Sequence, residues 1–264
     1  MVTRPERTDS YFSSSLEKGF RILRLFTKDR PAWSLTQIAK SIGLNKTSAF
    51  RFVNTLVQLG YLRKHPETKL ISLGAQVLNL SSAFAQTNHL SDIGKPFVDA
   101  VFEIHDITID LALFEGDTTA VAYRRESRKS MVPRFPTWPA FEKFHCSSIG
   151  KAILAFLPKE KMLTIVGKLP LIPHTPRTLV NKADLLADLE RTRERGYALS
   201  DEECVKGFIA IGAPILNLHS NETIGAVCFD FAAIQYSRAV IERKYAKVIV
   251  KLAGDISQAA TFQI

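Results

Sequence analysis

The chain has 264 residues and a formal net charge of +9 at pH 7, which is enough length for one large domain or for two ordinary ones. Its three cysteines, Cys146, Cys204 and Cys228, are odd in number and widely spaced, unlike the CxxC pairs of a zinc site or the even framework of a small secreted domain. The sequence has no signal peptide and no run of about 20 apolar residues. We therefore expect a cytoplasmic protein without a membrane segment.

The positive charge is concentrated near the N-terminal end. Residues 1–74 contain 13 Lys and Arg against 5 Asp and Glu, a balance of +8, whereas residues 75–264 contain 22 against 21. Because attraction to phosphates supplies most of the nonspecific affinity for nucleic acid, this asymmetry is expected of a DNA-binding segment attached to a nearly neutral domain. A basic surface that only faces solvent would have the same composition. A sequence motif is needed to distinguish it from a DNA-binding segment.

After an N-terminal arm of residues 1–13, expected to be flexible, the first predicted element is a helix in SLEKGFRILRLF, residues 15–26. Its apolar residues recur at helical spacing. A second helix is predicted directly after Ser34, which makes a capping box with Gln37, and it is expected to stop at Gly43.

A third helix, KTSAFRFVNTLVQLG, is predicted between the N-cap Asn45 and Gly60. Two short helices joined by a tight turn with glycine are typical of a helix-turn-helix, whose second helix can enter the major groove. Polar side chains on the exposed face of this third helix are expected to contact DNA. They are Lys46, Thr47, Ser48, Arg51 and Asn54.

The next segment, YLRKHPETKLISLG, predicts a hairpin with short strands over residues 61–64 and 69–73. A hairpin in this place is typical of the wing of a winged helix-turn-helix. The alternative is a plain three-helix bundle with a polar surface, but capping, turn glycine, wing and charge together favour a DNA-binding domain over residues 14–74. The wing side chains expected to contact phosphates or the minor groove are Arg63, Lys64 and Lys69.

A helix-prone stretch over residues 75–88 predicts a linker helix, and a second domain is predicted over residues 89–264. Helices in this domain alternate with strands that are mostly connected as hairpins, which indicates an α+β fold in which helices pack on a sheet. Its predicted elements are a helix over 92–105, strands over 107–114 and 118–124, a loop rich in proline and aromatic residues over 130–144, helices from 146 to 157 and 184 to 197, strands over 208–216 and 222–233, and a helix over 238–260.

The stretch HCSSIGKAILAF, residues 145–156, comes closest to catalytic patterns. It does not fit the GxxxxGK[ST] of a phosphate loop, because His145 stands at the first glycine position and Ala152 at the Ser/Thr position. No GxSxG elbow and no metal-ligand spacing of histidines is found, so we predict no catalytic residue, metal site or cofactor. An enzyme that uses Cys146 for acyl transfer or hydrolysis, with a basic adaptor domain, remains the alternative.

The same stretch predicts the start of a helix at residues 147–150, whose backbone N–H groups can bind a carboxylate or another polar ligand atom. The aromatic loop before it, with Trp138, would supply the apolar wall of a small-molecule pocket. The alternative is that these rings only fill the core under a long loop.

Several motifs, in this order, resemble the IclR-type transcriptional regulators of bacteria. They are SLEKGFRILRLF, SLTQIAKSIGLNKTSAFRFVNTLVQLGYLRK and ISLG, followed by FHCSSIGKAILAFLP, HTPRTL and RERGYALSDEECVKGFIAIGAPIL. The resemblance implies a winged helix-turn-helix, a linker helix and a GAF-like effector-binding domain. It also implies a regulator rather than an enzyme, which binds operator DNA as a dimer or tetramer and responds to a small organic effector.

The resemblance also implies positions for the effector site. Ser200 stands where members that bind small 2-oxo acids have an acid, Ala210 where they have a cysteine, and Cys228 and Asp230 where they have serines. Fewer hydroxyls and one extra carboxylate favour a larger, flatter effector, such as an aromatic catabolite. The family's ligand positions fall on Ser148, Ile149, Ser200, Phe208, Ala210, Cys228 and Asp230.

Overall fold

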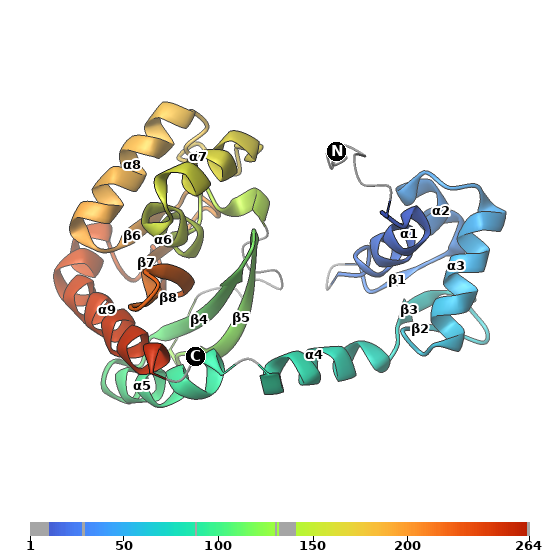
Figure 1. The fold of residues 1–264 in the computed structure, drawn as a ribbon, viewed down its shortest axis with the longest axis horizontal. Helices are drawn as coiled ribbons and strands as arrows, with labels where there is room; N and C mark the ends of the chain where they lie inside the picture. Colours follow the sequence, from blue (N-terminus) through green and yellow to red (C-terminus); the bar gives the residue numbers. More distant parts are fainter. Residues whose placement is uncertain (1–10, 28–29, 88, 130, 132–140, 263–264) are drawn as a thin grey trace. The chain divides into compact units, whose positions relative to one another are not determined.

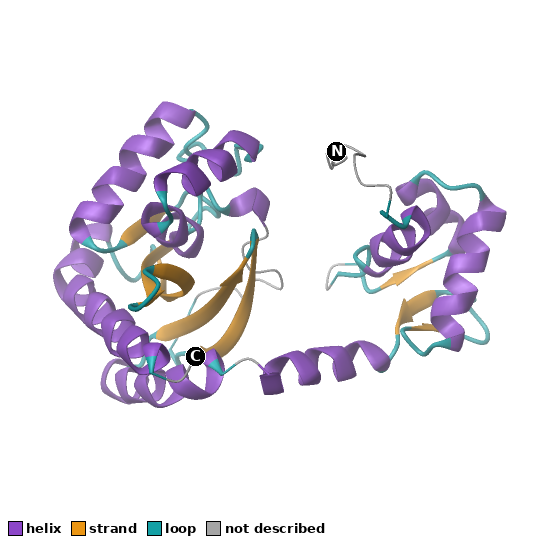
Figure 2. Ribbon diagram, viewed as in Figure 1, coloured by secondary structure: helices purple, strands orange, loops and turns teal. Residues whose placement is uncertain are grey.

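The computed structural model divides into two compact units, Met1–Thr87 and Asn88–Ile264, and each is described by itself (Figures 1 and 2). Trp138 and most of the arm over residues 1–13 lie outside the part of the chain that the structure describes. The described residues are 11–27, 30–87, 89–129, 131 and 141–262.

The N-terminal unit is a small helical domain with a three-stranded antiparallel sheet in the order β1-β3-β2. Its core contains Ile22, Ile38, Val53, Leu62 and Ile71. The elements are α1 (Ser14–Leu23), β1 (Ala32–Trp33), α2 (Leu35–Ile42), α3 (Lys46–Gln58), β2 (Leu62–Lys64), β3 (Ile71–Leu73) and α4 (Gln76–Thr87).

Local capping explains where the two helices of the helix-turn-helix begin and end. Ser34 and Gln37 form a reciprocal capping box at the start of α2, and Gly43 ends that helix in the left-handed conformation, with φ of 69°. Asn45 Oδ1 accepts the backbone N–H of Ser48 at 2.8 Å and so caps α3. These predicted boundaries are confirmed.

Strand β1 was not expected from the sequence. Ala32 pairs with Ser72 and Trp33 with Ile71, while the Trp33 indole N–H donates to the carbonyl of Leu25 at 3.1 Å. A strand of two residues has no periodicity of its own. Its conformation depends on pairing with the wing, which is distant in sequence.

The C-terminal unit is an α+β domain around a five-stranded antiparallel sheet in the order β5-β4-β8-β7-β6 (Figure 1). The predicted α+β fold class is confirmed. Among the described residues, none of the helices is both long and apolar enough to span a bilayer. The elements are α5 (Leu90–His105), β4 (Thr108–Glu115), β5 (Thr118–Arg125), a 3-10 turn η1 (Phe141–Lys143), α6 (Ser148–Phe156), α7 (Lys159–Lys168), α8 (Lys182–Arg195), β6 (Ala198–Asp201), β7 (Phe208–Asn217), β8 (Glu222–Ala232) and α9 (Arg238–Thr261).

The two faces of this sheet have different helical covers. Alternate residues of β8 show the division: Val227 and Phe229 pack on the side of α5 and α9, whereas Ala226 and Cys228 pack on the side of α6 and α8. Helix α6 lies directly against β6, β7 and β8. The face toward α6 is therefore the one that can bring the helix start and the predicted strand residues together.

The sequence did not indicate helix α7 or strand β6. Helix α7 follows Pro158 directly and has only two buried residues, Ile165 and Val166, so it carries a weak apolar pattern. Strand β6 is four residues long and pairs only with β7.

Candidate functional site

Helix α3 exposes the polar residues that were predicted to contact DNA. Its opposite face packs into the domain through Ala49 and Val53, which are buried. The exposed face is thus available to a groove of DNA, with the N-cap Asn45 at its leading end. Lys46, Thr47, Arg51 and Asn54 are exposed, and Ser48 is half-buried.

The hairpin of β2 and β3 carries the three basic wing residues, and Arg63, Lys64 and Lys69 are all exposed. Arg63 Nε donates to Ser72 Oγ at 2.9 Å across the hairpin, so its guanidinium is oriented while its terminal nitrogens remain available. Lys69 has a positive φ of 59° and its ammonium donates to the carbonyl of Pro66. The wing is therefore a basic surface with a defined backbone.

In the second unit, the start of α6 lies on the sheet at β7. The Ser147 side chain accepts the backbone N–H of Gly150 at 3.0 Å. The backbone N–H groups of Ser148 and Ile149 have no acceptor among the described residues. A Cβ at Gly212 would lie 2.8 Å from the carbonyl oxygen of Ser148, so only glycine allows this close approach.

The predicted strand positions fall in two adjacent cross-strand rows on the face toward α6. Directly opposite residues of paired strands point to the same face. One row runs from Ser200 through Ala210 and Asp230 to Thr108. The next row runs from Gly212 through Cys228 and Asp110 to Arg124.

Phe208 completes this group at the end of β7. It packs with Ala210 and Ala232 in a small apolar cluster, and its side chain is only 8% exposed. Ser148 and Ile149 are also buried. The structure thus brings all seven family positions onto one helix start and one sheet face, whereas Trp138 lies outside the described residues.

A pair of buried acids lies in these rows, and the sequence had indicated only one of them, Asp230. Asp110 is fully buried and accepts two hydrogen bonds from Arg124 Nη1, at 3.1 and 3.2 Å. Burial and the neighbouring Asp230 raise the pKa of Asp110 well above its ordinary value. Burial also raises the pKa of Asp230 to about 6, and the Cys228 thiol donates to Asp230 at 3.5 Å. The raised pKa values favour one protonated carboxyl in this pair.

A signal for Asp110 and Arg124 was present in the sequence. An acid interrupts the apolar run ITIDLALF at residues 107–114, just as Asp230 interrupts AVCFDFAA. A charged residue at the centre of a buried strand is rarely tolerated without a partner.

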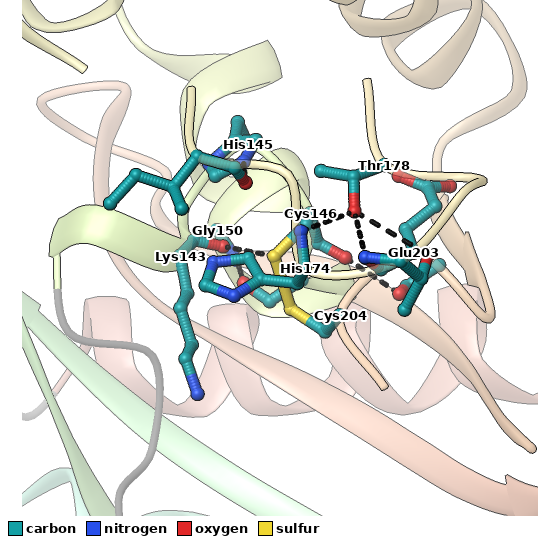
Figure 3. The surroundings of a disulfide bond; sticks show 12 residues. Lys143, His145, Cys146, Gly150, His174, Thr178, Glu203 and Cys204 are labelled. Atoms are coloured by element: carbon teal, nitrogen blue, oxygen red, sulfur yellow. Dashed lines mark hydrogen bonds between the residues drawn. A yellow bond between two sulfur atoms is a disulfide. The ribbon is translucent and has the colours of Figure 1, made fainter. Parts of the chain in front are cut away.

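Cys146 is not a free thiol in this structure. It forms a disulfide with Cys204, 58 residues away, with Cα atoms 5.1 Å apart (Figure 3). The wide spacing of the cysteines gave no sign of this pair. The adjacent His145 directs Nε2 to the carbonyl of Ile172 at 3.0 Å. No thiolate is present to act as the nucleophile that the enzyme alternative requires.

The lysine of the Gly-Lys pair in HCSSIGKAILAF lies in the interior of the protein. Lys151 is fully buried, and its ammonium lies 2.8 Å from Glu203 and 2.9 Å from Asp188. Burial raises the pKa of Glu203, whereas at Asp188 the attraction of Lys151 outweighs burial and the pKa is lowered. Lys151 is thus unavailable to a phosphate.

Ser200 connects the first cross-strand row to the loop before α6. Its hydroxyl donates to the carbonyl of Cys146 at 2.6 Å. The Ser200 hydroxyl, which stands in place of an acid, is therefore bound within the protein rather than free to contact a ligand. Its backbone still forms part of the first row opposite Ala210.

Comparison with known proteins accounts for both units. The IclR helix-turn-helix domain matches residues 15–66, and the bacterial transcriptional regulator IclR C-terminal domain matches residues 82–258. The transcriptional repressor IclR of Escherichia coli (strain K12) is 27% identical over 252 residues, which are 93% of this chain and 89% of that protein. The p-hydroxybenzoate hydroxylase transcriptional activator of Acinetobacter baylyi is 30% identical over 219 residues, 80% of this chain and 78% of that protein.

Among solved structures, an IclR homolog from Microbacterium hydrocarbonoxydans complexed with 4-hydroxybenzoate has a TM-score of 0.74 at 20% identity, covering 95% of this chain and 100% of that one. The prediction of a regulator rather than an enzyme is confirmed, and nothing supports the cysteine-enzyme alternative. The chain belongs to the IclR family of bacterial transcriptional regulators, which bind DNA through the helix-turn-helix and a small-molecule effector through the C-terminal domain.

Proposed function

We propose that residues 14–74 read operator DNA through α3 and the wing, and that residues 89–264 bind an aromatic hydroxy acid between the start of α6 and the buried acid pair. Residues 75–88 link the two. The observation that carries the effector assignment is the juxtaposition of the α6 start, at Ser148, with the two cross-strand rows.

One end of this site suits a carboxylate. The backbone N–H groups of Ser148 and Ile149 lack an acceptor among the described residues, and the helix dipole adds partial positive charge there. A carboxylate at this end would accept both N–H groups. A neutral ring end would leave them without partners, at a cost of about 1–3 kcal/mol each.

The other end suits a hydroxyl and disfavours a second carboxylate. The raised pKa values of Asp110 and Asp230 favour one protonated carboxyl, so the pair can both accept and donate a hydrogen bond. Gly212, against which Ser148 lies, is two strands from Asp110 in the second row, roughly 9–10 Å at ordinary strand spacing. One benzene ring with a carboxylate and a hydroxyl at opposite ends fits that span.

Two of the relatives support this class of effector. The Acinetobacter baylyi relative is a p-hydroxybenzoate hydroxylase transcriptional activator, and the Microbacterium hydrocarbonoxydans homolog is complexed with 4-hydroxybenzoate. Because the proposed partner is operator DNA, we place the protein in the cytoplasm, and because the resemblance to IclR-type regulators implies a dimer or a tetramer, we propose that it acts as a homo-oligomer.

The effector proposal is tested by thermal shift and by operator binding with 4-hydroxybenzoate, benzoate and a small 2-oxo acid. We expect 4-hydroxybenzoate to raise the melting temperature and to change operator affinity, because a ligand stabilises the state that it binds. Benzoate should bind more weakly, since it leaves the acid pair without its hydroxyl. Equal binding of all three acids, or of none, would contradict the assignment.

A matched pair of glycine variants tests the location. Gly212→Ala places a methyl group 2.8 Å from the Ser148 carbonyl and should displace the start of α6, so effector binding should be lost. Gly254→Ala, in α9, meets no atom within 4 Å and should leave binding unchanged.

The DNA-binding part of the proposal is tested by fluorescence anisotropy with DNA from upstream of the gene. Arg51→Ala should weaken binding by about 1–3 kcal/mol if Arg51 contacts a base. Lys206→Ala removes an exposed charge from the other unit and serves as the control. If Arg51→Ala binds like the unaltered protein, the recognition-helix assignment is wrong.

A further inference from the structure

The loops around Cys146 bring two imidazoles next to the disulfide (Figure 3). One ring nitrogen of His145, one of His174 and Cys146 Sγ all lie within 4.8 Å of one another. The two ring centroids are 5.8 Å apart and the ring planes are inclined by 31°. Neither the DNA surface nor the effector rows use these imidazoles, so their arrangement needs another explanation.

His145 holds an unused ligand atom in the protein interior. Its side chain is fully buried, and Nε2 donates to the carbonyl of Ile172, so Nδ1 carries the lone pair. Nδ1 is buried and makes no hydrogen bond of ordinary geometry to a described residue, although the backbone of Glu142 also interacts with this ring. A buried acceptor without a partner costs about 1–3 kcal/mol. A backbone carbonyl on the far nitrogen is also the contact that orients imidazoles bound to metals.

His174 is held beside Cys204 by a threonine. The backbone N–H of His174 donates to Thr178 Oγ1 at 3.0 Å, and that hydroxyl donates to the carbonyl of Glu203 at 2.6 Å (Figure 3). The loop with His174 and the loop with Cys204 are therefore fixed to each other in advance.

We propose that His145, Cys146 and His174 form a zinc site that is available when the Cys146–Cys204 disulfide is reduced. Imidazole nitrogen and thiolate sulfur are preferred ligands of Zn²⁺, and three protein ligands leave a fourth position for Cys204 or water. A sulfur in a disulfide is not a thiolate. The disulfide and the metal thus compete for Cys146 Sγ.

The exchange between the two states balances in electrons and protons. A cellular dithiol gives two electrons and two protons to the disulfide, which becomes the thiols of Cys146 and Cys204, while the dithiol becomes a disulfide. Zn²⁺ then displaces the proton of the Cys146 thiol, which passes to solvent. A disulfide oxidant reverses the process: it takes two electrons from the two sulfurs, re-forms the bond and releases the ion.

This site is coupled to the helix start. The carbonyl of Cys146 accepts the Ser200 hydroxyl at 2.6 Å, and the next residue, Ser147, caps α6. A change of partner at Cys146 Sγ therefore occurs one residue from the N-cap.

The test is equilibrium dialysis of the full chain against zinc chloride, followed by elemental analysis, after treatment with a phosphine reductant or with a disulfide oxidant. We expect one zinc ion per chain in the reduced protein and none in the oxidised protein. Cys204→Ser cannot form the disulfide but keeps all three ligands, so it should bind one zinc ion after either treatment.

Ligand variants separate this site from adventitious binding. His174→Ala alters an exposed residue and should weaken zinc binding by roughly tenfold or more. His219→Ala, on an exposed turn after β7, should not. A reduced protein that binds no zinc, a Cys146→Ser variant that binds it as tightly as the reduced chain, or equal binding by both redox states would overturn the proposal.

Discussion

Replacing Asp230 by asparagine should stabilise the effector-binding domain at neutral pH. Burial raises the pKa of Asp230 to about 6 from its ordinary 3.8. At 1.36 kcal/mol per unit, ionising this carboxyl in the folded state costs about 3 kcal/mol relative to the unfolded chain. An asparagine side chain at this position has the same shape and carries no charge.

The direction of the pH dependence of stability follows from proton binding. The folded state holds the Asp230 proton more tightly than the unfolded state, so its stabilisation is complete below about pH 4 and is lost as the pH rises through about 6. The free energy of unfolding of Asp230→Asn should therefore increase relative to that of the unaltered protein as the pH rises. Urea unfolding of the C-terminal unit between about pH 4 and pH 8 measures this difference.

Asp99→Asn is the opposite control. Burial tends to raise the pKa of Asp99, but hydrogen bonds from Tyr123 and Arg125 outweigh it and the pKa is lowered. This variant should be less stable than the unaltered protein throughout pH 4–8, and the difference should shrink only below about pH 3.8, where the unaltered protein loses this stabilisation. A difference between Asp230→Asn and the unaltered protein that is constant with pH would refute the buried-charge reasoning.

Three further changes test other parts of the molecule. Ser34→Ala removes the capping box with Gln37 and should destabilise the N-terminal unit by about 0.5–2 kcal/mol in calorimetry. Lys151→Met removes the buried cation that Glu203 and Asp188 share, leaving Asp188 with Arg191 alone at 3.4 Å, and should cost about 3–5 kcal/mol in urea unfolding. Arg63→Ala should weaken binding to specific and nonspecific DNA alike and reduce the slope of affinity against salt by about 1, and an unchanged slope would remove the wing from the phosphate contacts.

The elements that the sequence predicted well are those whose signals are local. Ser34, Gln37, Gly43 and Asn45 act on backbone groups within four residues, so their spacing in the chain determines where α2 and α3 begin and end. The long amphipathic α9 is found for the same reason.

The features that were missed depend on partners far away in the chain. Strand β1 exists because Trp33 pairs with Ile71. The Cys146–Cys204 disulfide has a separation of 58 residues and no characteristic spacing. Sequence order alone cannot show which face of a sheet a helix start will meet. The second row of the site, with Asp110, therefore required the register between β4 and β8.

In the proposed effector site, Ala210 is a position at which the volume can be changed. It stands between Ser200 and Asp230 in the first row, with a side chain that is only 3% exposed and belongs to neither the Cys146 loop nor the acid pair. A series of glycine, alanine, serine and valine at position 210 would vary the volume beside it in steps. The hydrogen bonds of the Cys146 loop and of the acid pair would stay intact. The DNA-reading unit could then be kept and connected to new chemical inputs, which is how a biosensor would be built on this chain.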